Sequence, residues 1–450
     1  MSDRSLQELV ESTDPARFLR ENSGAYPFPF PDEYTHWIEE QRAWRETCAL
    51  ADQSYHMTGL HVEGPDALGL YADLGVNSFA DFPVGRAKQL VTCNPDGYLI
   101  GDGILYHLAA DTFFSIGVPT VANWLTFNAE TGDYDVETER SGSAFEVDGD
   151  PEYFRFQLQG PNAMALIEDV ADGPVPDVPF FGFDDLDVCG HTVQGLRHGM
   201  AGEAGLELWG PFEWGAEIKE TLLDVGADYG LRQLGSKSYE STAVESGWIA
   251  LPVPAIYEHE DLREYREWLD ADAFEGILSI GGSYAPEAVT DYYMTPYDLG
   301  YGHHVAFDHD FLGREALESM AAAPERTKVT LVWDATDVVD VFASLFRDGE
   351  TYKFMDLVAP RWSAAHYDRV LDGERTVGVS KYLGYTYNER KFLSLASVET
   401  DLAEPGTDVT VVWGEADSPK PNVERHVERE IRATVAPVPY KPDRRKDPTA

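Results

Sequence analysis

Short apolar segments separated by turn residues recur along this 450-residue chain, and they dominate its C-terminal end. Five of them follow one another there, at residues 328–333, 376–380, 393–398, 408–413 and 432–438. A series of short strands with turns between them is typical of a small β-barrel. We therefore predict a C-terminal β-barrel domain over residues 325–440, with its boundary within residues 319–327.

The region before the barrel, residues 1–320, mixes helices and strands without the regular alternation of a doubly wound parallel sheet. Periodicity predicts strands at residues 59–64, 87–91, 99–108, 113–117, 154–159 and, as a pair, 193–209. It predicts helices at residues 5–19, 32–48, 65–74, 161–170 and 211–229. Residues 64–67 and 160–163 both place Gly-Pro between a strand and a helix, which suggests two related halves. We expect an α+β fold with two interleaved α+β subdomains before the barrel.

The charge balance is strongly acidic. The chain has 80 Asp and Glu against 34 Lys and Arg, a formal net charge of −46. The acids are spread along the chain, as in proteins that stay dissolved in concentrated salt, so we expect a halophilic host, an archaeon. Nucleic-acid binding is disfavoured because phosphate contacts need clustered Lys and Arg. The one basic cluster, Arg444-Arg445-Lys446, is interpreted as a solvated terminus.

The cysteines and the hydropathy of the chain disfavour several further classes of protein. Cys48, Cys93 and Cys189 lie far apart and are odd in number, which disfavours a thiolate zinc site and a disulfide framework. The segment Met1–Ser5 lacks the apolar core of a signal peptide. No apolar run approaches the ~18 residues that a membrane span needs. We expect a cytoplasmic protein that associates with neither membrane nor nucleic acid.

One polar cluster resembles a metal site at first sight. It comprises His303, His304, Asp308, His309 and Asp310. Phe307 and Phe311 bracket the acids as residues at a strand or turn edge would, so we expect no metal. The chain also lacks the Gly-x-Ser-x-Gly, P-loop and His-Glu-x-x-His motifs.

Glu207 occupies an unusual position, within the alternating apolar segment Leu206-Glu207-Leu208-Trp209. A carboxylate among apolar neighbours is costly to bury unless something pairs with it. A planar heterocycle with two adjacent N–H donors would satisfy both of its oxygens. Alternation equally allows Glu207 to face solvent, and the spacing leaves both interpretations open.

Three further polar residues are candidates for chemistry. Gln53 and His56 are three residues apart in a segment between a predicted helix and a predicted strand, where both can reach one cavity. Tyr239 precedes a proline-rich segment, and a tyrosine in an apolar cleft can donate a proton because phenol is neutral at pH 7. Each of the three can also serve a purely structural role.

Together these residues resemble the glycine-cleavage T-protein (aminomethyltransferase) superfamily. Residues 202–207, Gly-Glu-Ala-Gly-Leu-Glu, are similar to its Gly-Glu-x-Gly segment, and residues 310–317 to its junction motif before the barrel. Residues 85–87 and 96–102 follow in the family's order. The resemblance implies folate-binding domains around a central cleft, and tetrahydrofolate or a modified pterin carrier as cofactor.

Within this superfamily, the sequence more closely resembles the tetrahydrofolate-dependent aromatic O-demethylases of the vanillate and syringate type. It rests on residues 24–26, 52–57, 122–125, 197–202, 245–249, 265–269, 301–302, 307–311 and 343–346. It implies that Glu207 grips the pterin, with Asp102, Gly205 and Trp248 also at the cofactor. It makes Tyr239 the catalytic residue, with His56 and Gln53 beside it. Three residues would complete the substrate pocket, namely Tyr26, Phe28 and Val118.

Two positions depart from the demethylase pattern, and two from the T-protein pattern. Val118 stands where vanillate-type enzymes have an arginine, so an aromatic carboxylate would lose its charge-assisted partner. Phe28 replaces a tyrosine. Asp102, preceded by glycine, stands at the acidic pair of the T-protein, and Ala243 at its arginine, which disfavours glycine cleavage.

The sequence therefore predicts transfer of a methyl group from a small methoxylated, aromatic donor to N5 of tetrahydrofolate. One alternative is an aminomethyltransferase, or a demethylase of a methylated amine or sulfonium. A second is a folate-binding protein without catalysis, although the Lys-Gly-Cys-Tyr-x-Gly-Gln motif of such members is absent. The sequence leaves the oligomeric state open.

Overall fold

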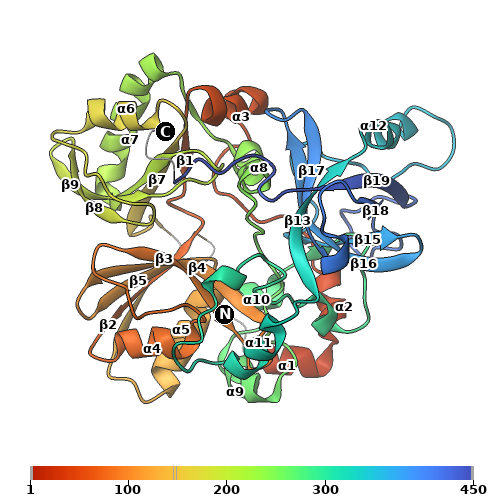
Figure 1. Cartoon of the computed structure of the whole chain (residues 1–450), viewed down its shortest axis with the longest axis horizontal. Coiled ribbons are helices and arrows are strands. Elements are labelled where there is room, and N and C mark those ends of the chain that lie inside the picture. The colour runs from red at the N-terminus through yellow and green to blue at the C-terminus, as the bar shows by residue number, and fades with distance from the viewer. Residues whose placement is uncertain (1–3, 145, 148, 447–450) are drawn as a thin grey trace.

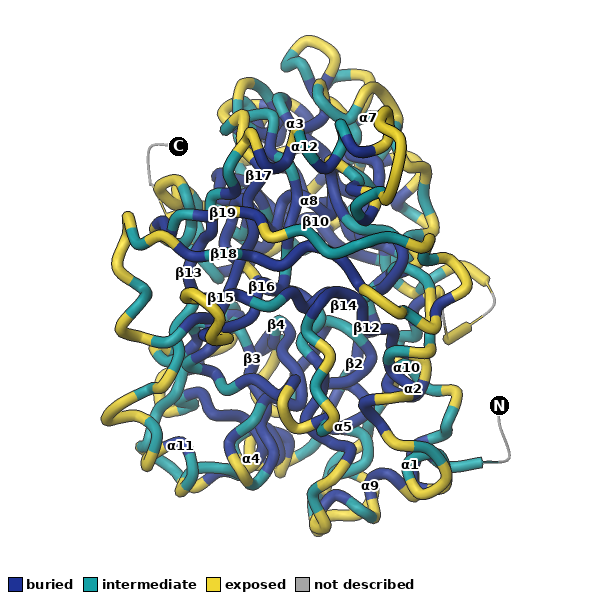
Figure 2. The backbone as a smooth tube through the Cα atoms, turned by 90° about the vertical axis from the view of Figure 1, so that its right-hand side faces the viewer, coloured by how far each residue is buried: buried dark blue, intermediate teal, exposed yellow. Residues whose placement is uncertain are grey.

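The computed structural model describes residues 4–144, 146, 147 and 149–446. Two β-sheets and a closed barrel surround the middle of the molecule (Figure 1). The six-stranded sheet and the five-stranded sheet face each other, and the barrel lies beside both. Buried backbone is concentrated in the strands and in the central helix α8, Ser236–Ser246, while exposed backbone lies in peripheral loops (Figure 2). The expected α+β class is confirmed.

The five-stranded sheet has the order β3-β4-β5-β2-β6. Its strands are β2 Thr58–Glu63, β3 Ala87–Cys93, β4 Leu99–Ala109, β5 Thr112–Gly117 and β6 Glu137–Ser141. Helices α4, Ala67–Leu74, and α5, Pro119–Thr131, cover one face (Figure 1). Leu60, Val62 and Leu105 belong to the core on this side, where their burial stabilises the sheet.

The six-stranded sheet has the order β11-β1-β7-β10-β9-β8. Its strands are β1 Cys48–Asp52, β7 Tyr153–Gln159, β8 Phe183–Val188, β9 His191–Arg197, β10 Gly205–Pro211 and β11 Leu231–Gln233. Helices α6, Ala163–Val170, and α7, Phe212–Gly226, pack on one face against alternate strand residues such as Phe156 and Leu208. The intervening residues of β7 and β10 therefore point to the opposite face, towards the middle of the molecule.

The two Gly-Pro segments occupy equivalent places in the two sheets. Gly64, with φ 147°, ends β2 and leads to α4, and Gly160, with φ 121°, ends β7 and leads to α6. Glycine tolerates these dihedrals because it has no Cβ. The strand–Gly-Pro–helix layout predicted from the sequence is present in both halves.

The predicted C-terminal barrel is confirmed as a closed structure with the order β13-β17-β16-β15-β18-β19. Its strands are β13 Arg326–Trp333, β15 Asp368–Asp372, β16 Arg375–Thr386, β17 Lys391–Glu399, β18 Asp408–Trp413 and β19 Arg429–Ala436. Trp333, Val411 and Trp413 are among the side chains of its core. Helix α12, Ala335–Ser344, lies on its outer side (Figure 1).

Two predicted helices have different bounds in the structure. The segment 5–19 forms two helices, α1 Leu6–Ser12 and α2 Pro15–Glu21, because Pro15 lacks an amide donor and starts a new helix capped by Asp14. The segment 32–48 contains only α3, Trp37–Glu46, capped by His36. Cys48 begins β1, so residues 53–57 join two strands rather than a helix and a strand.

The remaining α-helices and strands of the described residues are short. They are α9 Arg263–Trp268, α10 Phe274–Ile277, α11 Arg314–Ala321 and the paired strands β12 Ile280–Gly281 and β14 Ala365–His366. Within the described ranges, every helix is too short or too polar to cross a membrane.

Candidate active site

A cavity of about 1080 Å³ lies between the two sheets, helix α8 and the barrel. Its volume slightly exceeds the ~300–1,000 Å³ typical of ligand pockets, enough for a large ligand beside a small one. Nine of the ten residues predicted for the site line this cavity: Tyr26, Phe28, Gln53, His56, Asp102, Val118, Glu207, Tyr239 and Trp248. The fold therefore brings together residues that are up to 222 positions apart in sequence, from Tyr26 to Trp248.

The Tyr239 hydroxyl is held by the other two candidate catalytic residues. The side-chain amide of Gln53 donates a hydrogen bond to it at 3.1 Å, and it lies 2.8 Å from Nε2 of His56. Burial lowers the pKa of His56 to about 3 and raises the pKa of Tyr239 above its usual value. Both groups are therefore neutral at pH 7, and the tautomer of His56 determines which of them donates in this hydrogen bond.

Two buried polar atoms of this cluster have no hydrogen-bond partner among the described residues. They are Oε1 of Gln53 and Nδ1 of His56. Leaving a buried donor or acceptor unpaired costs ~1–3 kcal/mol, so such atoms usually have an additional partner such as a ligand or water. Because both residues line the cavity, a bound substrate can supply the missing partners.

Aromatic side chains surround the Tyr239–His56 pair. The ring of Phe28 lies 5.2 Å from that of His56 and 5.3 Å from that of Tyr239, and Phe30 lies 5.9 Å from Tyr239. Tyr26 packs on Phe28 at 5.1 Å, and its hydroxyl donates to the backbone carbonyl of His56. This aromatic collar excludes water from the hydroxyl and offers flat surfaces to an aromatic ligand.

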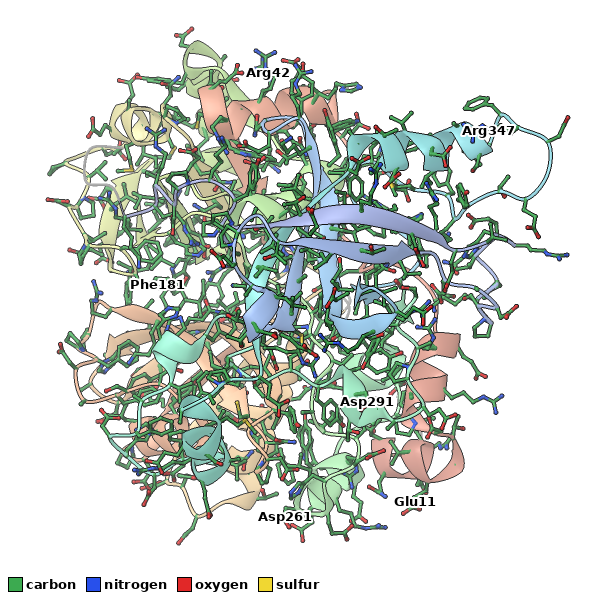
Figure 3. All side chains as sticks on the ribbon, turned by 45° about the vertical axis from the view of Figure 1, so that its right-hand side comes forward. Glu11, Arg42, Phe181, Asp261, Asp291 and Arg347 are labelled. Carbon is green, nitrogen blue, oxygen red and sulfur yellow. The ribbon has the colours of Figure 1, made fainter. Side chains whose placement is uncertain are left out.

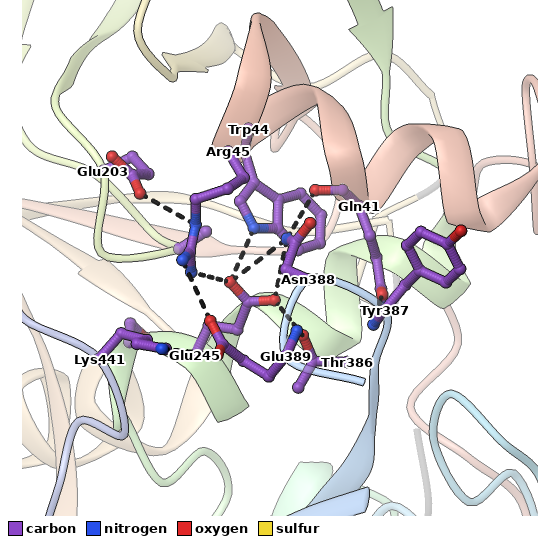
Figure 4. A network of polar contacts seen from close by, with 12 residues as sticks. Gln41, Trp44, Arg45, Glu203, Glu245, Thr386, Tyr387, Asn388, Glu389 and Lys441 are labelled. Carbon is purple, nitrogen blue, oxygen red and sulfur yellow. Dashed lines mark hydrogen bonds and ion pairs between the residues drawn. The ribbon is translucent and has the colours of Figure 1, made fainter. Parts of the chain in front are cut away.

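Helix α8, which carries Tyr239, is fixed through the carboxylate of Glu245 (Figure 4). That carboxylate accepts hydrogen bonds from Trp44 at 3.0 Å and Arg45 at 2.8 Å, both on α3. It also accepts from Asn388, in the turn between β16 and β17, at 3.1 Å. The helix is thus tied to α3 and to the barrel at the same point, which fixes the position of Tyr239.

Glu207 lies on β10 and is only 1% exposed, which excludes the solvent-facing alternative. Its Oε1 pairs with the guanidinium of Arg155 on the neighbouring strand β7 and accepts a hydrogen bond from Tyr106 at 3.2 Å. Its Oε2 has no bonded donor among the described residues, since His198 Nδ1 is 4.0 Å away. One carboxylate oxygen therefore remains for a ligand.

The sequence pattern also marks Arg155, which was not among the predicted site residues. Like Glu207, it is a charged residue that interrupts an apolar strand. Arg155 lies in the apolar segment Tyr153-Phe154-Arg155-Phe156, is 2% exposed, and faces the cavity side of the sheet with Glu207. Its Nε and Nη1 atoms have no partner within the described part of the chain. The Arg155–Glu207 pair thus presents unpaired donors and an acceptor side by side, which suits a heterocycle bearing both kinds of group.

Asp102 and Trp248 form a second polar group on the cavity wall. The Asp102 carboxylate accepts hydrogen bonds from Tyr301 at 2.9 Å and from the indole of Trp248 at 3.2 Å. Burial raises the pKa of Asp102, although these hydrogen bonds act in the opposite direction. Gly205 does not line the cavity; a Cβ there would collide with the carbonyl of Leu158, so it permits close pairing of β10 with β7.

Phe181, in the segment that connects the five-stranded and six-stranded sheets, also lines the cavity. Phe181 lies where the sheet of β8–β10 meets the sheet of β3–β5 (Figure 3). Its carbonyl accepts from Ala87 on β3 at 2.7 Å, and its amide donates to Arg197 on β9 at 2.9 Å. The two sheets are therefore joined directly beside the cavity.

Arg444 and Lys446, interpreted as part of a solvated terminus, are exposed, but the segment also makes tertiary contacts. The amide of Arg444 donates to the carbonyl of Gly202 at 2.8 Å, and its guanidinium lies 3.7 Å from Glu203. Arg445 and Lys446 line the cavity. The chain leaves β19 and crosses from the barrel to the six-stranded sheet (Figure 1), a course that the sequence did not indicate.

The His and Asp cluster at residues 303–310 has structural contacts. His309 hydrogen-bonds the carbonyl of Ala72 through Nε2 and Asp308 through Nδ1, each at 3.0 Å. Among the residues that the structure describes, no three His, Cys, Asp or Glu side chains are placed to hold a metal ion.

Comparisons with known proteins agree with this architecture. Residues 13–254 match the sequence profile of the family described as GCVT N-terminal domain. The structure also resembles the crystal structure of glycine cleavage system aminomethyltransferase T from Bartonella henselae, with a TM-score of 0.64. The match covers 97% of each chain, at 18% sequence identity. That likeness shows the fold.

Two curated relatives are similar over nearly the whole chain. A syringate O-demethylase of Sphingobium sp. is 43% identical over 97% of this chain and 96% of its own length. A sesamin methylene transferase of Sinomonas sp. is 31% identical over 93% of each chain. The chain therefore belongs to the GCVT aminomethyltransferase family.

Proposed function

We propose that this protein transfers a methyl group from a small methoxylated aromatic compound to N5 of tetrahydrofolate or of a related pterin carrier. The observation that carries the proposal is the hydrogen bond between Tyr239 and His56 inside the aromatic collar. The 43% identity to a syringate O-demethylase over nearly the full length supports the same reaction type.

The arrangement at Tyr239 suits a proton donor to a departing phenolate oxygen. In the reaction the methyl carbon forms a bond to N5 and its bond to the aryl ether oxygen breaks. The oxygen leaves with the bonding electrons and needs a proton. Tyr239 is neutral at pH 7, because burial raises its pKa, and can donate that proton in the apolar collar. Gln53 and His56 hold the hydroxyl in position before and after the transfer.

The polar face of the six-stranded sheet fits the pterin. A bound tetrahydrofolate would supply the amine nucleophile. Glu207 would accept pterin N–H groups through its free Oε2, while Arg155 would donate to pterin acceptors through Nε and Nη1. Asp102, on β4, and Trp248, just after α8, line the same cavity and would bound the same ligand. Holding donor and acceptor in line supplies much of the rate enhancement in such a reaction.

A second candidate is transfer of a methylene group. It is favoured by the 31% identity to a sesamin methylene transferase over 93% of both chains. Both reactions need the same proton at the departing oxygen, so the Tyr239–His56 pair does not distinguish them. The oxidation state of the product does: a methoxy donor gives 5-methyltetrahydrofolate, and a methylenedioxy donor gives 5,10-methylenetetrahydrofolate. Incubating the protein with tetrahydrofolate and each donor, followed by mass spectrometry, separates the two.

A further inference from the structure

A β-bulge in barrel strand β16 projects one lysine into the cavity. Ser380 pairs with Ala396 and Tyr382 with Leu395, so Lys381 is an extra residue without a partner across the strand. Bulges redirect a side chain out of the regular alternation, and they are frequent beside binding sites. Lys381 is 1% exposed and lines the cavity.

Lys381 differs from the other buried lysines in the described part of the chain. Lys420, 3% exposed, pairs with Glu415, and Lys353, 2% exposed, pairs with Glu424 at 2.7 Å. Lys381 has no such ion pair. Its ammonium donates only to the backbone carbonyls of Ala250, at 3.2 Å, and Leu251, at 2.6 Å, and it lies 4.5 Å from the ring centre of Tyr367.

The environment of Lys381 favours a negatively charged ligand group beside its ammonium. Burying an ammonium without a counter-charge is costly, and burial lowers the pKa of Lys381 to about 7. Leu251, whose carbonyl accepts from the ammonium, has a φ of 50°, a strained value for a residue with a branched side chain. Backbone strain of this kind is concentrated at binding sites. With two carbonyls taking two of its N–H groups, Lys381 has one donor left for a ligand.

The location of Lys381 relates it to the substrate side of the cavity. Its neighbour Tyr367 follows strand β14 and the segment that begins at Ser363. Ser363 forms a β-bridge with Gly24, two residues before Tyr26 of the aromatic collar. The Ser363 hydroxyl lines the same cavity and, in the described chain, has no partner. Glu207 and Arg155, in contrast, belong to the six-stranded sheet.

We propose that Lys381 is the counter-ion for a carboxylate on the aromatic methyl donor. It would take the place of the arginine that the related vanillate-type pattern has at Val118, from a different wall of the cavity. The ligand class is therefore a methoxylated aromatic acid rather than a neutral methoxyphenol. This inference rests on the proposed function. Folate also carries a carboxylate, on its glutamate, and the test separates the two sources.

The test compares two ligands that differ only in the carboxylate: 4-hydroxy-3,5-dimethoxybenzoate and 2,6-dimethoxyphenol. Calorimetry with the full chain measures the Kd of each, and of tetrahydrofolate, for the natural protein and for Lys381→Met. We expect the wild type to favour the acid, and Lys381→Met to bind the acid 10- to 100-fold more weakly, as for loss of a hydrogen bond between charged groups. Binding of the phenol and of tetrahydrofolate should stay within about twofold.

Two further variants keep the test decisive. Lys381→Gln retains donors for the carbonyls of Ala250 and Leu251 without the charge, so it replaces Lys381→Met if that variant does not fold. Lys391→Met removes an exposed lysine of the same barrel and should leave all three Kd values unchanged. Equal weakening of acid and phenol would show a structural role, and selective weakening of tetrahydrofolate would assign Lys381 to the folate carboxylate; either result overturns the proposal. Calorimetry measures binding without turnover, so it tests the role of Lys381 independently of whether the protein transfers a methyl group.

Discussion

The Tyr239 hydroxyl lies 2.8 Å from Nε2 of His56, and burial holds both groups in their neutral forms. A phenol that is hydrogen-bonded to a neutral imidazole in an apolar collar keeps its proton until a stronger base develops next to it. The oxygen of a departing methoxyarene is such a base. The pair is therefore suited to protonate a leaving group rather than to attack a substrate.

Removal of the Tyr239 hydroxyl should strongly slow turnover while sparing folate binding. Tyr239→Phe keeps the ring in the collar but removes the proton donor, so kcat should fall ~10²–10⁴-fold, the usual contribution of a general acid. The Kd for tetrahydrofolate should change little. Steady-state kinetics and calorimetry measure both. Tyr229→Phe, which removes a hydroxyl outside the cavity lining, is the matched control; near-normal turnover in Tyr239→Phe contradicts the assigned role.

His56 should make the folded protein less stable at mildly acidic pH. Its pKa is about 3 in the folded state against about 6.5 when unfolded, so between these values the unfolded chain binds more protons. Stability therefore falls as pH decreases from 6.5 towards 3, and this residue alone costs ~2 kcal/mol at pH 5.

Urea unfolding of the natural protein and of His56→Gln at pH 7 and pH 5 measures this effect. The stability difference between the two pH values should be smaller in His56→Gln by that amount. His191→Gln, which alters a histidine stacked on Trp214 near the surface, should retain the full pH dependence. An identical pH dependence in all three proteins would mean that His56 is not held neutral by burial.

The Arg155–Glu207 pair should be strongly coupled. Either Arg155→Met or Glu207→Gln leaves one buried charge uncompensated, which costs ~3–5 kcal/mol of stability. The double variant should be much less destabilised than the sum of the two, because it leaves neither charge alone. Denaturant unfolding of all four proteins gives the coupling free energy. Additive effects would show that the two charges do not interact across β7 and β10.

Glu245 should act on turnover through the position of helix α8. Glu245→Gln weakens the contacts to Trp44, Arg45 and Asn388, and should reduce stability by ~1–3 kcal/mol. Turnover at a temperature where the variant is fully folded should still fall, with kcat affected more than KM. Glu39→Gln, on the exposed face of α3, is the control and should match the natural protein in both. Unchanged kcat in folded Glu245→Gln would show that the network only stabilises the fold.

The sequence predicted the strands and the barrel well because each has a local signal. Alternation and turn residues placed β4, β7 and β10 within a few residues. Helix α8 was missed because nearly every position in it is buried, from Tyr239 to Glu245, so its polar residues form no amphipathic pattern. Ser241 and Glu245 bond to side chains of α3 and the barrel, contacts that no local rule reveals.

The sequence predicted only those parts of the candidate site that have a local signal. Glu207 was noticeable because a lone carboxylate interrupts an apolar strand. Its partner Arg155 and the lysine at the bulge, Lys381, depend on strand register and on packing between distant segments. Similarly, the course of the C-terminal residues to Gly202 follows from tertiary contacts alone. Sequence patterns identified residue types suited to the chemistry, and the fold determined which of them meet.

The most direct test of the account follows the methyl group itself. The protein is incubated with tetrahydrofolate and 4-hydroxy-3,5-dimethoxybenzoate labelled with ¹³C in its methoxy groups, and the folate products are analysed by mass spectrometry. Methyl transfer predicts 5-methyltetrahydrofolate carrying the label, together with the demethylated catechol, and formation of both ~10²–10⁴-fold more slowly with Tyr239→Phe. Unlabelled folate with intact methoxy groups, or label recovered only as formaldehyde, would contradict it.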